Sequence, residues 1–341
     1  MHLRAYTNGL TLRLLPILAL FACATPVARG VVLYATDQRN TNPPGTITNH
    51  GTGHTPGGSD DPRRLLNSGW QWVGNYSIFT GTAISSRHFV IASHVGINPN
   101  NTFFYQGQNY TIDTTFNGGA GFAQSPNTDL TVFRVNGTFP NFAPMWNDAV
   151  DGTEVGRPLV AVGRGAKRGA EVRVNGVLKG WQFDFNGQDG ARSWGENVVD
   201  RLVNGGPTLG QLIAMNFDAD GGPNEASLSV GDSSGGVFIK SGNQWKLAGV
   251  IFGNDGPWRV NSGDPSFFAN IFDAGGLWIG NNPQFIADSD VDIPSSSYAT
   301  RISSNLAWIN SVIGAGVAPE PSSGLTLLAL LPMLRRRARR A

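Results

Sequence analysis

The sequence predicts an all-β protein, and three observations support this fold class. Of the 341 residues, 45 are glycine and only 14% are charged, a composition that suits a loop-rich β protein better than a helical bundle. From Trp70 onwards, short apolar or alternating stretches are separated by turns rich in asparagine and glycine. No helical repeat or coiled-coil pattern interrupts them. Such spacing is typical of β-sandwiches and β-barrels.

The N-terminal region, residues 1–24, has the pattern of a secretory signal peptide. Two arginines precede an apolar run from Leu14 to Phe21, and Ala22-Cys23-Ala24 offers a small-x-small cleavage site. A lipoprotein signal with acylated Cys23 is the alternative, although the phenylalanine at the second position of Leu20-Phe21-Ala22-Cys23 fits that pattern poorly. Residues 25–69 are expected to form an irregular N-terminal arm, because most of them are polar, proline or glycine without an apolar period.

The body of the chain then reads as one short strand after another. The predicted strands are Trp70 to Thr80, Thr82 to Ile84, Phe89 to Ala92, Phe103 to Ile112 and Asp129 to Val135. Residues 180–199 are interpreted as a long insertion containing tryptophans, with packing of the loop favoured over a flap that faces a substrate. Residues 267–279 are a candidate for an added hairpin.

One stretch carries a candidate nucleophile. Residues 230–237 read Val-Gly-Asp-Ser-Ser-Gly-Gly-Val and lead into an apolar run. A serine among small residues before a strand is how acyl-transfer enzymes present a nucleophile, since glycines let backbone N–H groups crowd around a developing oxyanion. By itself such a cluster usually marks an ordinary turn, so the assignment depends on other residues.

Two further stretches supply a candidate base and its acidic partner. His94 follows the apolar strand in Ile-Ala-Ser-His, and Asp129 opens the alternating strand in Thr-Asp-Leu-Thr-Val. Along the chain the order is therefore histidine, aspartate, serine. The subtilisins and the α/β-hydrolases carry these three residue types in other orders along the chain.

These stretches resemble the chymotrypsin-like (trypsin-fold) serine peptidases. Ile-Ala-Ser-His is similar to the family's Thr-Ala-Ala-His, Thr-Asp-Leu-Thr-Val to its Asp-Ile-Ala-Leu, and Gly-Asp-Ser-Ser-Gly-Gly to its Gly-Asp-Ser-Gly-Gly. Residues 159–165 resemble the first strand of the family's second barrel, residues 245–252 resemble the strand that lines its substrate cleft, and residues 298–313 resemble its closing strand and C-terminal helix. The resemblance implies two six-stranded antiparallel β-barrels with a C-terminal helix in residues 70–314, joined near residues 140–158. It also implies peptide hydrolysis through an acyl-enzyme.

The resemblance leaves two candidates for the nucleophile. An ungapped match makes Ser233 the nucleophile and keeps the family's oxyanion glycine, Gly231, at the cost of a serine where the family has a glycine. The other match makes Ser234 the nucleophile but changes two residues, including that glycine. The first is favoured, with His94 and Asp129 completing the triad and the backbone N–H groups of Gly231 and Ser233 forming the oxyanion hole.

The substrate pocket is expected at Ser227, Phe252 and Gly253. In the Ser233 alignment Ser227 stands near the position that is acidic in peptidases selecting arginine or lysine, so no preference for basic residues follows. Phe252 and Gly253 replace the serine and the aromatic residue that the family usually carries there, so the sequence leaves specificity open. It also leaves zymogen activation open, because the Ile-Val-Gly-Gly start of trypsin-like zymogens is not visible.

The C-terminal residues, 315–341, resemble a PEP-CTERM sorting signal of diderm bacteria. The motif Pro319-Glu320-Pro321 is followed by an apolar run and then by five arginines within residues 335–340. An apolar run capped by cations keeps its end on the cytoplasmic side of a membrane. The run has about 10 residues, whereas ~20 are needed to cross a bilayer. The expected role is therefore a transient anchor that an exosortase removes.

Charge and composition limit the partners. Without its basic ends the chain has 18 basic and 23 acidic residues, a net charge of about −5, which argues against nucleic acid as a partner. The expected partners are a peptide or protein substrate, signal peptidase and an exosortase. No cofactor is expected, and the alternating Asp288, Asp290 and Asp292 are interpreted as a solvated loop rather than a metal site.

The sequence thus predicts an exported serine endopeptidase of the cell envelope, cell surface or extracellular matrix of a diderm bacterium. The main alternative is a surface or biofilm-matrix adhesion protein that keeps the fold without turnover, because PEP-CTERM proteins as a group include many matrix components.

Overall fold

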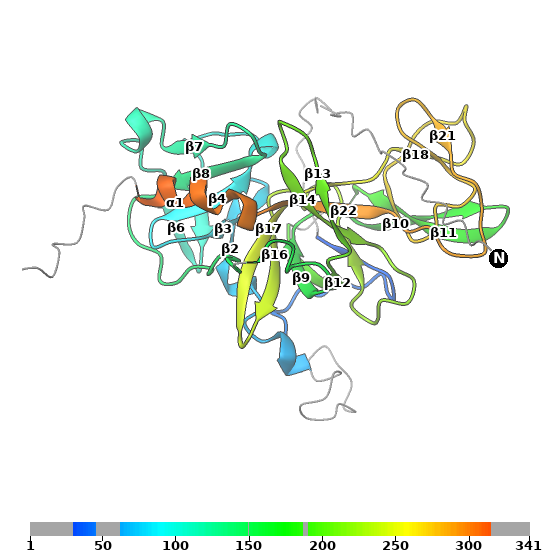
Figure 1. Cartoon of the computed structure of the whole chain (residues 1–341), viewed down its shortest axis with the longest axis horizontal. Coiled ribbons are helices and arrows are strands. Elements are labelled where there is room, and N and C mark those ends of the chain that lie inside the picture. The colour runs from blue at the N-terminus through cyan, green and yellow to red at the C-terminus, as the bar shows by residue number, and fades with distance from the viewer. Residues whose placement is uncertain (1–29, 46–61, 149, 187–189, 315–341) are drawn as a thin grey trace, which may run out of the picture.

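The computed structural model describes residues 30–45, 62–148, 150–186 and 190–314. The predicted signal peptide and the sorting signal lie outside these residues. Two β-barrels lie next to each other, with the helix α1 (Leu306–Gly314) packed on the first one and two smaller sheets at the opposite end of the molecule (Figure 1). The predicted all-β class with two six-stranded antiparallel barrels and a C-terminal helix is confirmed.

The first barrel is built from a seven-stranded antiparallel sheet with the order β6-β5-β2-β3-β4-β8-β7. Its strands are β2 (Val73–Tyr76), β3 (Phe79–Ala83), β4 (His88–Ala92), β5 (Thr102–Tyr105), β6 (Gln108–Thr111), β7 (Phe122–Gln124) and β8 (Leu130–Arg134). Ile112 directly after β6 pairs with Val135 directly after β8. This bridge closes six strands into a barrel, and β7 adds a seventh strand beside β8.

The second barrel has the order β12-β9-β16-β17-β22-β14-β13. Its strands are β9 (Pro158–Gly163), β12 (Ser193–Val198), β13 (Arg201–Asn204), β14 (Gln211–Asn216), β16 (Gly236–Ser241), β17 (Gln244–Asn254) and β22 (Ser296–Arg301). The first and last strands of this order, β12 and β13, are consecutive parts of one bent strand. At the bend, Val199 N–H donates to Arg157 and Asp200 N–H to Ala214, so this strand bonds to both neighbours and closes the barrel with six strands.

Two small sheets extend the second barrel, and they correct two expectations. One sheet has the order β10-β11-β19 and the other β18-β20-β21. Their strands are β10 (Lys167–Val174), β11 (Val177–Asp184), β18 (Trp258–Arg259), β19 (Ala269–Ile271), β20 (Trp278–Ile279) and β21 (Gln284–Phe285). Residues 267–279 are therefore no hairpin, because β19 and β20 pair with different sheets. Trp181 on β11 and Trp194 on β12 are buried in strands rather than carried by an inserted loop.

The segment before the first barrel was expected to be irregular, and part of it is a strand. β1 (Val32–Leu33) pairs antiparallel with β15 (Ala226–Ser227), a few residues before the candidate nucleophile. Val31, Val32 and Leu33 are buried because they pack on the second barrel. The N-terminal arm is thus a structural part of that barrel.

The apolar core explains why the two barrels meet where they do. On β4, Phe89 and Ile91 fill the first barrel, whereas Val90 and Ala92 face a cluster shared by both barrels and α1. On β16, Val237 and Ile239 fill the second barrel and Phe238 faces that shared cluster. Since alternate residues of a strand point to opposite faces, each strand contributes to two cores. The end of β4 and the beginning of β16 are therefore held together at the junction of the barrels.

Candidate active site

His94 and Asp129 are brought together by strand pairing in the first barrel. His94 lies in a 3₁₀ turn (Ser93–Val95) directly after β4, and Asp129 directly precedes β8. β4 and β8 pair antiparallel with Ala92 opposite Leu130, so the two residues fall at the same end of the sheet. Asp129 Oδ1 accepts the backbone N–H of His94 at 2.9 Å, and Oδ2 lies 2.6 Å from His94 Nδ1. These two contacts hold the imidazole in one orientation.

Ser233 reaches the other side of the same imidazole from the second barrel. Its Oγ lies 2.8 Å from His94 Nε2, so one chain of hydrogen bonds joins Asp129, His94 and Ser233. The side chain of His94 is 34% exposed, while that of Asp129 is only 7% exposed. The serine and the histidine are thus open to a large molecule, whereas the carboxylate is shielded from water.

The turn that presents Ser233 is anchored by the buried carboxylate of Asp232. Asp232 Oδ1 accepts the N–H of Gly165 at 2.6 Å, and Oδ2 accepts the N–H and the hydroxyl of Ser229 at 2.8 and 2.9 Å. The backbone of Val31 also bonds to this carboxyl group. Burial raises the pKa of Asp232 to about 6, against the effect of these hydrogen bonds. Position 165 must be glycine, because a Cβ there would lie 2.3 Å from Ser229 Oγ.

Two backbone N–H groups next to Ser233 are free to bind an anion. The carbonyl of Val230 accepts the N–H of Ala166 at 2.9 Å. In a trans peptide the N–H points opposite to the carbonyl, so the N–H of Gly231 faces away from Ala166. Gly231 has a φ of 99°, which glycine adopts without strain. Within the part of the chain that the structure describes, the N–H groups of Gly231 and Ser233 have no hydrogen-bond partner.

Ser234 has a different environment from Ser233. It is fully buried, and its Oγ accepts the backbone N–H of Ala92 at 3.0 Å. Its φ is 74°, in the left-handed region that favours glycine. The structure thus brings Ser233 to His94, and Ser234 instead ties the nucleophile turn to the end of β4.

The residues expected to line a substrate pocket lie on both sides of the turn. The ring of Phe252 meets the His94 ring edge-on, with centroids 5.6 Å apart. A Cβ on Gly253 would meet nothing within 4 Å, so the backbone there is open. Ser227 is buried and bonds to Asn270 and Ser297 instead of facing an open pocket. Sequence reasoning missed Asn254, which donates to Leu228 and Ser297; its position directly after Gly253 was the available signal.

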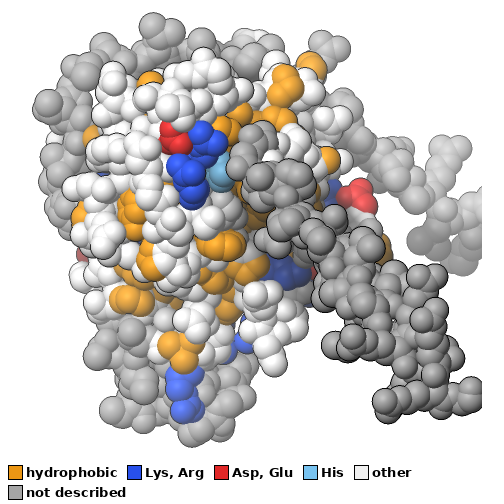
Figure 2. Space-filling view, turned by 90° about the vertical axis from the view of Figure 1, so that its left-hand side faces the viewer, with side chains coloured by type: hydrophobic (Ala, Val, Ile, Leu, Met, Phe, Trp, Pro, Cys, Tyr) orange, Lys and Arg blue, Asp and Glu red, His pale blue; other side chains and the backbone are white. Residues whose placement is uncertain are grey.

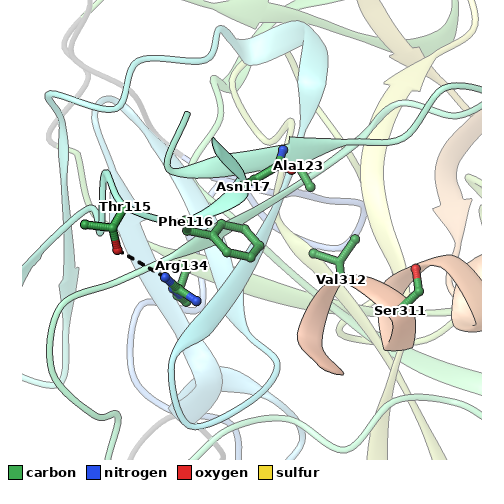
Figure 3. A pocket seen from close by; sticks show the side chains of 7 residues that line it. All are labelled: Thr115, Phe116, Asn117, Ala123, Arg134, Ser311 and Val312. Atoms are coloured by element: carbon green, nitrogen blue, oxygen red, sulfur yellow. Dashed lines mark hydrogen bonds between the residues drawn. The ribbon is translucent and has the colours of Figure 1, made fainter. Parts of the chain in front are cut away.

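A separate cavity of about 420 Å³ lies between the first barrel and α1. Figure 3 shows Phe116 and Arg134 on one side and Val312 and Ser311 of the helix on the other. Arg134 is already bonded to Asp113 and to Thr115, so its charge is largely neutralised. On the face of the molecule in Figure 2, charged side chains are few and lie at several separate places. The cavity contains none of the residues around Ser233.

Neither a cluster of metal-binding side chains nor a membrane-spanning helix is present in the described residues. No group of three or more His, Cys, Asp or Glu residues in residues 30–45, 62–148, 150–186 and 190–314 could hold a metal ion. No helix in the same residues is long and apolar enough to span a membrane.

Fold and site together define a double β-barrel protein with a serine, a histidine and an aspartate in one hydrogen-bonded chain at the barrel junction. No protein-family model and no curated protein sequence matches this chain. Among solved structures, it is similar to Rv3671c from M. tuberculosis H37Rv, a serine-to-alanine mutant in an inactive form, with 12% identity and a TM-score of 0.40 over 75% of this chain and 95% of that one. It is also similar to a mutant of human heparin binding protein (CAP37), with 12% identity and a TM-score of 0.43 over 74% and 95%.

Proposed function

We propose that the protein is a serine endopeptidase that hydrolyses peptide bonds through an acyl-enzyme. The observation that carries this proposal is the continuous contact from Asp129 through His94 to Ser233, next to two unpaired N–H groups. An ordinary surface serine has no base within hydrogen-bond distance and no donors aimed at its substrate.

Each residue has a distinct role in the proposed reaction. His94 carries its proton on Nδ1, where Asp129 accepts it, so Nε2 is free to take the proton of Ser233. The serine oxygen attacks the carbonyl carbon, and the N–H groups of Gly231 and Ser233 bind the resulting oxyanion. His94 then protonates the leaving amine, and a water molecule activated by the same imidazole releases the acyl group.

An open strand edge next to Ser233 favours a peptide as the substrate. At its C-terminal end β17 pairs with β22 on one side, with Asn254 opposite Ser297, while β16 on its other side begins only at Gly236. The N–H of Asp255 points to β22, and neighbouring residues of a strand point to opposite sides. The N–H and carbonyl of Asn254 therefore face the open edge, where an extended peptide can add as a strand.

Labelling with a fluorophosphonate tests this proposal. The purified protein should react with one equivalent of the reagent at Ser233, located by tandem mass spectrometry of the labelled peptide. Ser233→Ala should abolish labelling, whereas the matched variant Ser234→Gly should retain it, because it keeps the left-handed backbone and the contact between His94 and Ser233. If folded protein is not labelled, the alternative hypothesis of an adhesion protein without catalytic activity is favoured. An adduct on Ser234 would show that Ser234, and not Ser233, is the nucleophile.

We also propose that the enzyme is exported and then handed to the cell surface or extracellular matrix by an exosortase. The signal-peptide pattern of residues 1–24 and the Pro319-Glu320-Pro321 motif before an apolar, arginine-capped tail support this route. Replacing Pro319, Glu320 and Pro321 by alanine should leave the protein in the membrane fraction of a host that has an exosortase. Release of this variant at the wild-type rate would remove the sorting role of the motif.

A further inference from the structure

The polar residues behind the reacting serine form a hydrogen-bond network, in which Asn270 Nδ2 has no partner among the described residues. Ser227 Oγ lies 3.0 Å from Asn270 Oδ1 and 2.9 Å from Ser297 Oγ. Ser297 Oγ is also 3.1 Å from the backbone nitrogen of Leu228 and 3.0 Å from Asn254 Nδ2. Ser227, Ser297 and Asn270 are buried, with at most 2% of their surface exposed. The base of the expected substrate pocket is therefore filled by protein groups.

The protons of this network can be assigned by counting. Each hydroxyl has one proton to donate and two lone pairs to accept with. Since Asn270 Oδ1 can only accept, Ser227 donates to it and accepts from Ser297. Ser297 then accepts from Leu228 N–H and from Asn254 Nδ2. Ser297 thus uses its proton and both lone pairs, whereas Ser227 uses its proton and one lone pair. Moving Asn254 away would leave the Leu228 carbonyl and one lone pair of Ser297 without their donor, which is costly for buried groups.

The side chain of Asn254 bridges two segments of the second barrel near Ser233, namely residues 228–231 and residues 252–254 of β17. Next to these segments, near the reacting serine, Ser234 N–H donates to the carbonyl of Ile251 at 2.9 Å. At the other end Asn254 Nδ2 donates to the carbonyl of Leu228 at 2.5 Å. The side chain of Asn254 thus reaches from one segment to the other.

We propose that Asn254 blocks the pocket for the side chain that precedes the cleaved bond, and that the enzyme cleaves after small residues: glycine, alanine or serine. A peptide bound along the open edge of β17 places the side chain of its reacting residue between the two segments. A methyl or hydroxymethyl group fits above the Asn254 amide. A larger side chain must displace the amide and break its bonds to Leu228 and Ser297. This inference rests on the proposed peptidase activity.

Peptidyl diphenyl phosphonates test the specificity separately from the activity. The serine oxygen replaces one phenoxide on phosphorus, and the residue beside the phosphorus occupies the pocket. The wild-type protein should be inactivated at least ~50-fold faster by the alanyl reagent than by the phenylalanyl reagent, a ratio within the range of a size-selective pocket. Asn254→Gly should lower this ratio at least ~10-fold by admitting the phenyl ring. Asn282→Gly, which makes the same change in an exposed loop, should keep the wild-type ratio.

The outcomes separate the inference from the proposed function. If fluorophosphonate labels Ser233 but the two phosphonates react equally fast, or neither reacts, the pocket assignment is wrong and the peptidase proposal stands. If fluorophosphonate does not label folded protein, the peptidase proposal fails and the specificity with it. Should Asn254→Gly not fold, Asn254→Ser shortens the side chain in the same way and should lower the ratio in the same direction; an unchanged ratio in a folded variant overturns the role of Asn254.

Discussion

The two barrels contribute to the site in different ways. In the first barrel His94 and Asp129 lie at the ends of two paired strands, so local strand register alone places them. In the second barrel Ser233 lies in a turn between two residues of positive φ, Gly231 and Ser234. That turn depends on Asp232, which bonds to groups from distant parts of the chain, including Gly165. Side chains of the site in the first barrel can therefore be replaced without disturbing the fold of that barrel. The conformation of the nucleophile turn, by contrast, depends on contacts with distant parts of the chain.

The largest effect is expected from His94→Ala. Without a base Ser233 is a poor nucleophile, so the rate of peptide hydrolysis should fall by about 10⁴-fold or more. Because the side chain of His94 is 34% exposed, little packing is lost and the melting temperature should stay close to that of the wild type. Activity assays paired with thermal melts would check both statements. A variant with activity within about tenfold of the wild type would remove His94 from the mechanism.

Asp232→Asn should affect activity and stability together. Oδ1 accepts the N–H of Gly165 and Oδ2 that of Ser229, so an amide must turn its NH₂ group toward one of these donors. An unmet buried donor costs about 1–3 kcal/mol, and we expect a lower melting temperature with fluorophosphonate labelling slowed by about 100-fold as the turn shifts. Asp290→Asn makes the same change on an exposed residue and should change neither quantity. Normal labelling of Asp232→Asn would show that the turn does not need this anchor.

The same contrast explains what could be predicted from the sequence. His94 and Asp129 could be predicted because the short stretches that carry them, Ile-Ala-Ser-His and Thr-Asp-Leu-Thr-Val, resemble motifs of chymotrypsin-like peptidases in the same chain order. A histidine or an aspartate next to an apolar strand would not by itself have indicated a site. The bond between Asn254 and Leu228 joins residues 26 positions apart, and no periodicity indicates it. Strands such as β18 (Trp258–Arg259) and β20 (Trp278–Ile279) have two residues each, too few to show an alternation. The role of Val31 at Asp232 likewise depends on how the N-terminal segment folds back.

Phe252→Ala tests how far the second barrel supports the histidine of the first. The Phe252 ring meets the His94 ring edge-on and shields it on that side, so its loss would admit water and loosen the imidazole. We expect labelling at Ser233 to slow by about tenfold, less than for the two preceding variants. Phe285→Ala removes a phenyl ring that is 55% exposed and serves as the control. Equal labelling rates for both variants would mean that Phe252 does not position His94.

The barrels also differ in how they accommodate buried carboxyl groups. In the first barrel, hydrogen bonds from Thr115 and the neighbouring Arg134 hold the pKa of Asp113 below its usual range, and Arg87 bonds to the same carboxylate. In the second barrel Glu154 forms such a pair with Arg301. Burial raises the pKa of Glu225 to about 9, since only N–H groups reach it and Asp218 adds a like charge. The ionised form of Glu225 thus destabilises the folded protein, whereas the ionised form of Asp113 stabilises it.

Glu225→Gln should remove that destabilising effect and stabilise the protein at alkaline pH. The ordinary pKa of this carboxyl group is 4.5, and it is raised to about 9 in the folded protein. Below pH 4.5 this carboxyl group is protonated in both the folded and the unfolded protein, and its contribution to stability is fully present. That contribution is lost as the pH rises toward 9, because the unfolded protein releases the proton more readily than the folded protein. Glutamine does not titrate, and its oxygen can keep the bonds from Asn197 and from the N–H of Asp218. The variant should therefore exceed the wild type in unfolding free energy by about 1–3 kcal/mol at pH 8, with a difference that shrinks toward pH 5.

Urea melts across this pH range measure the difference in unfolding free energy, and Glu171→Gln, with a side chain that is 51% exposed, is the control. A difference that does not change with pH would show that Glu225 is not held protonated by its surroundings.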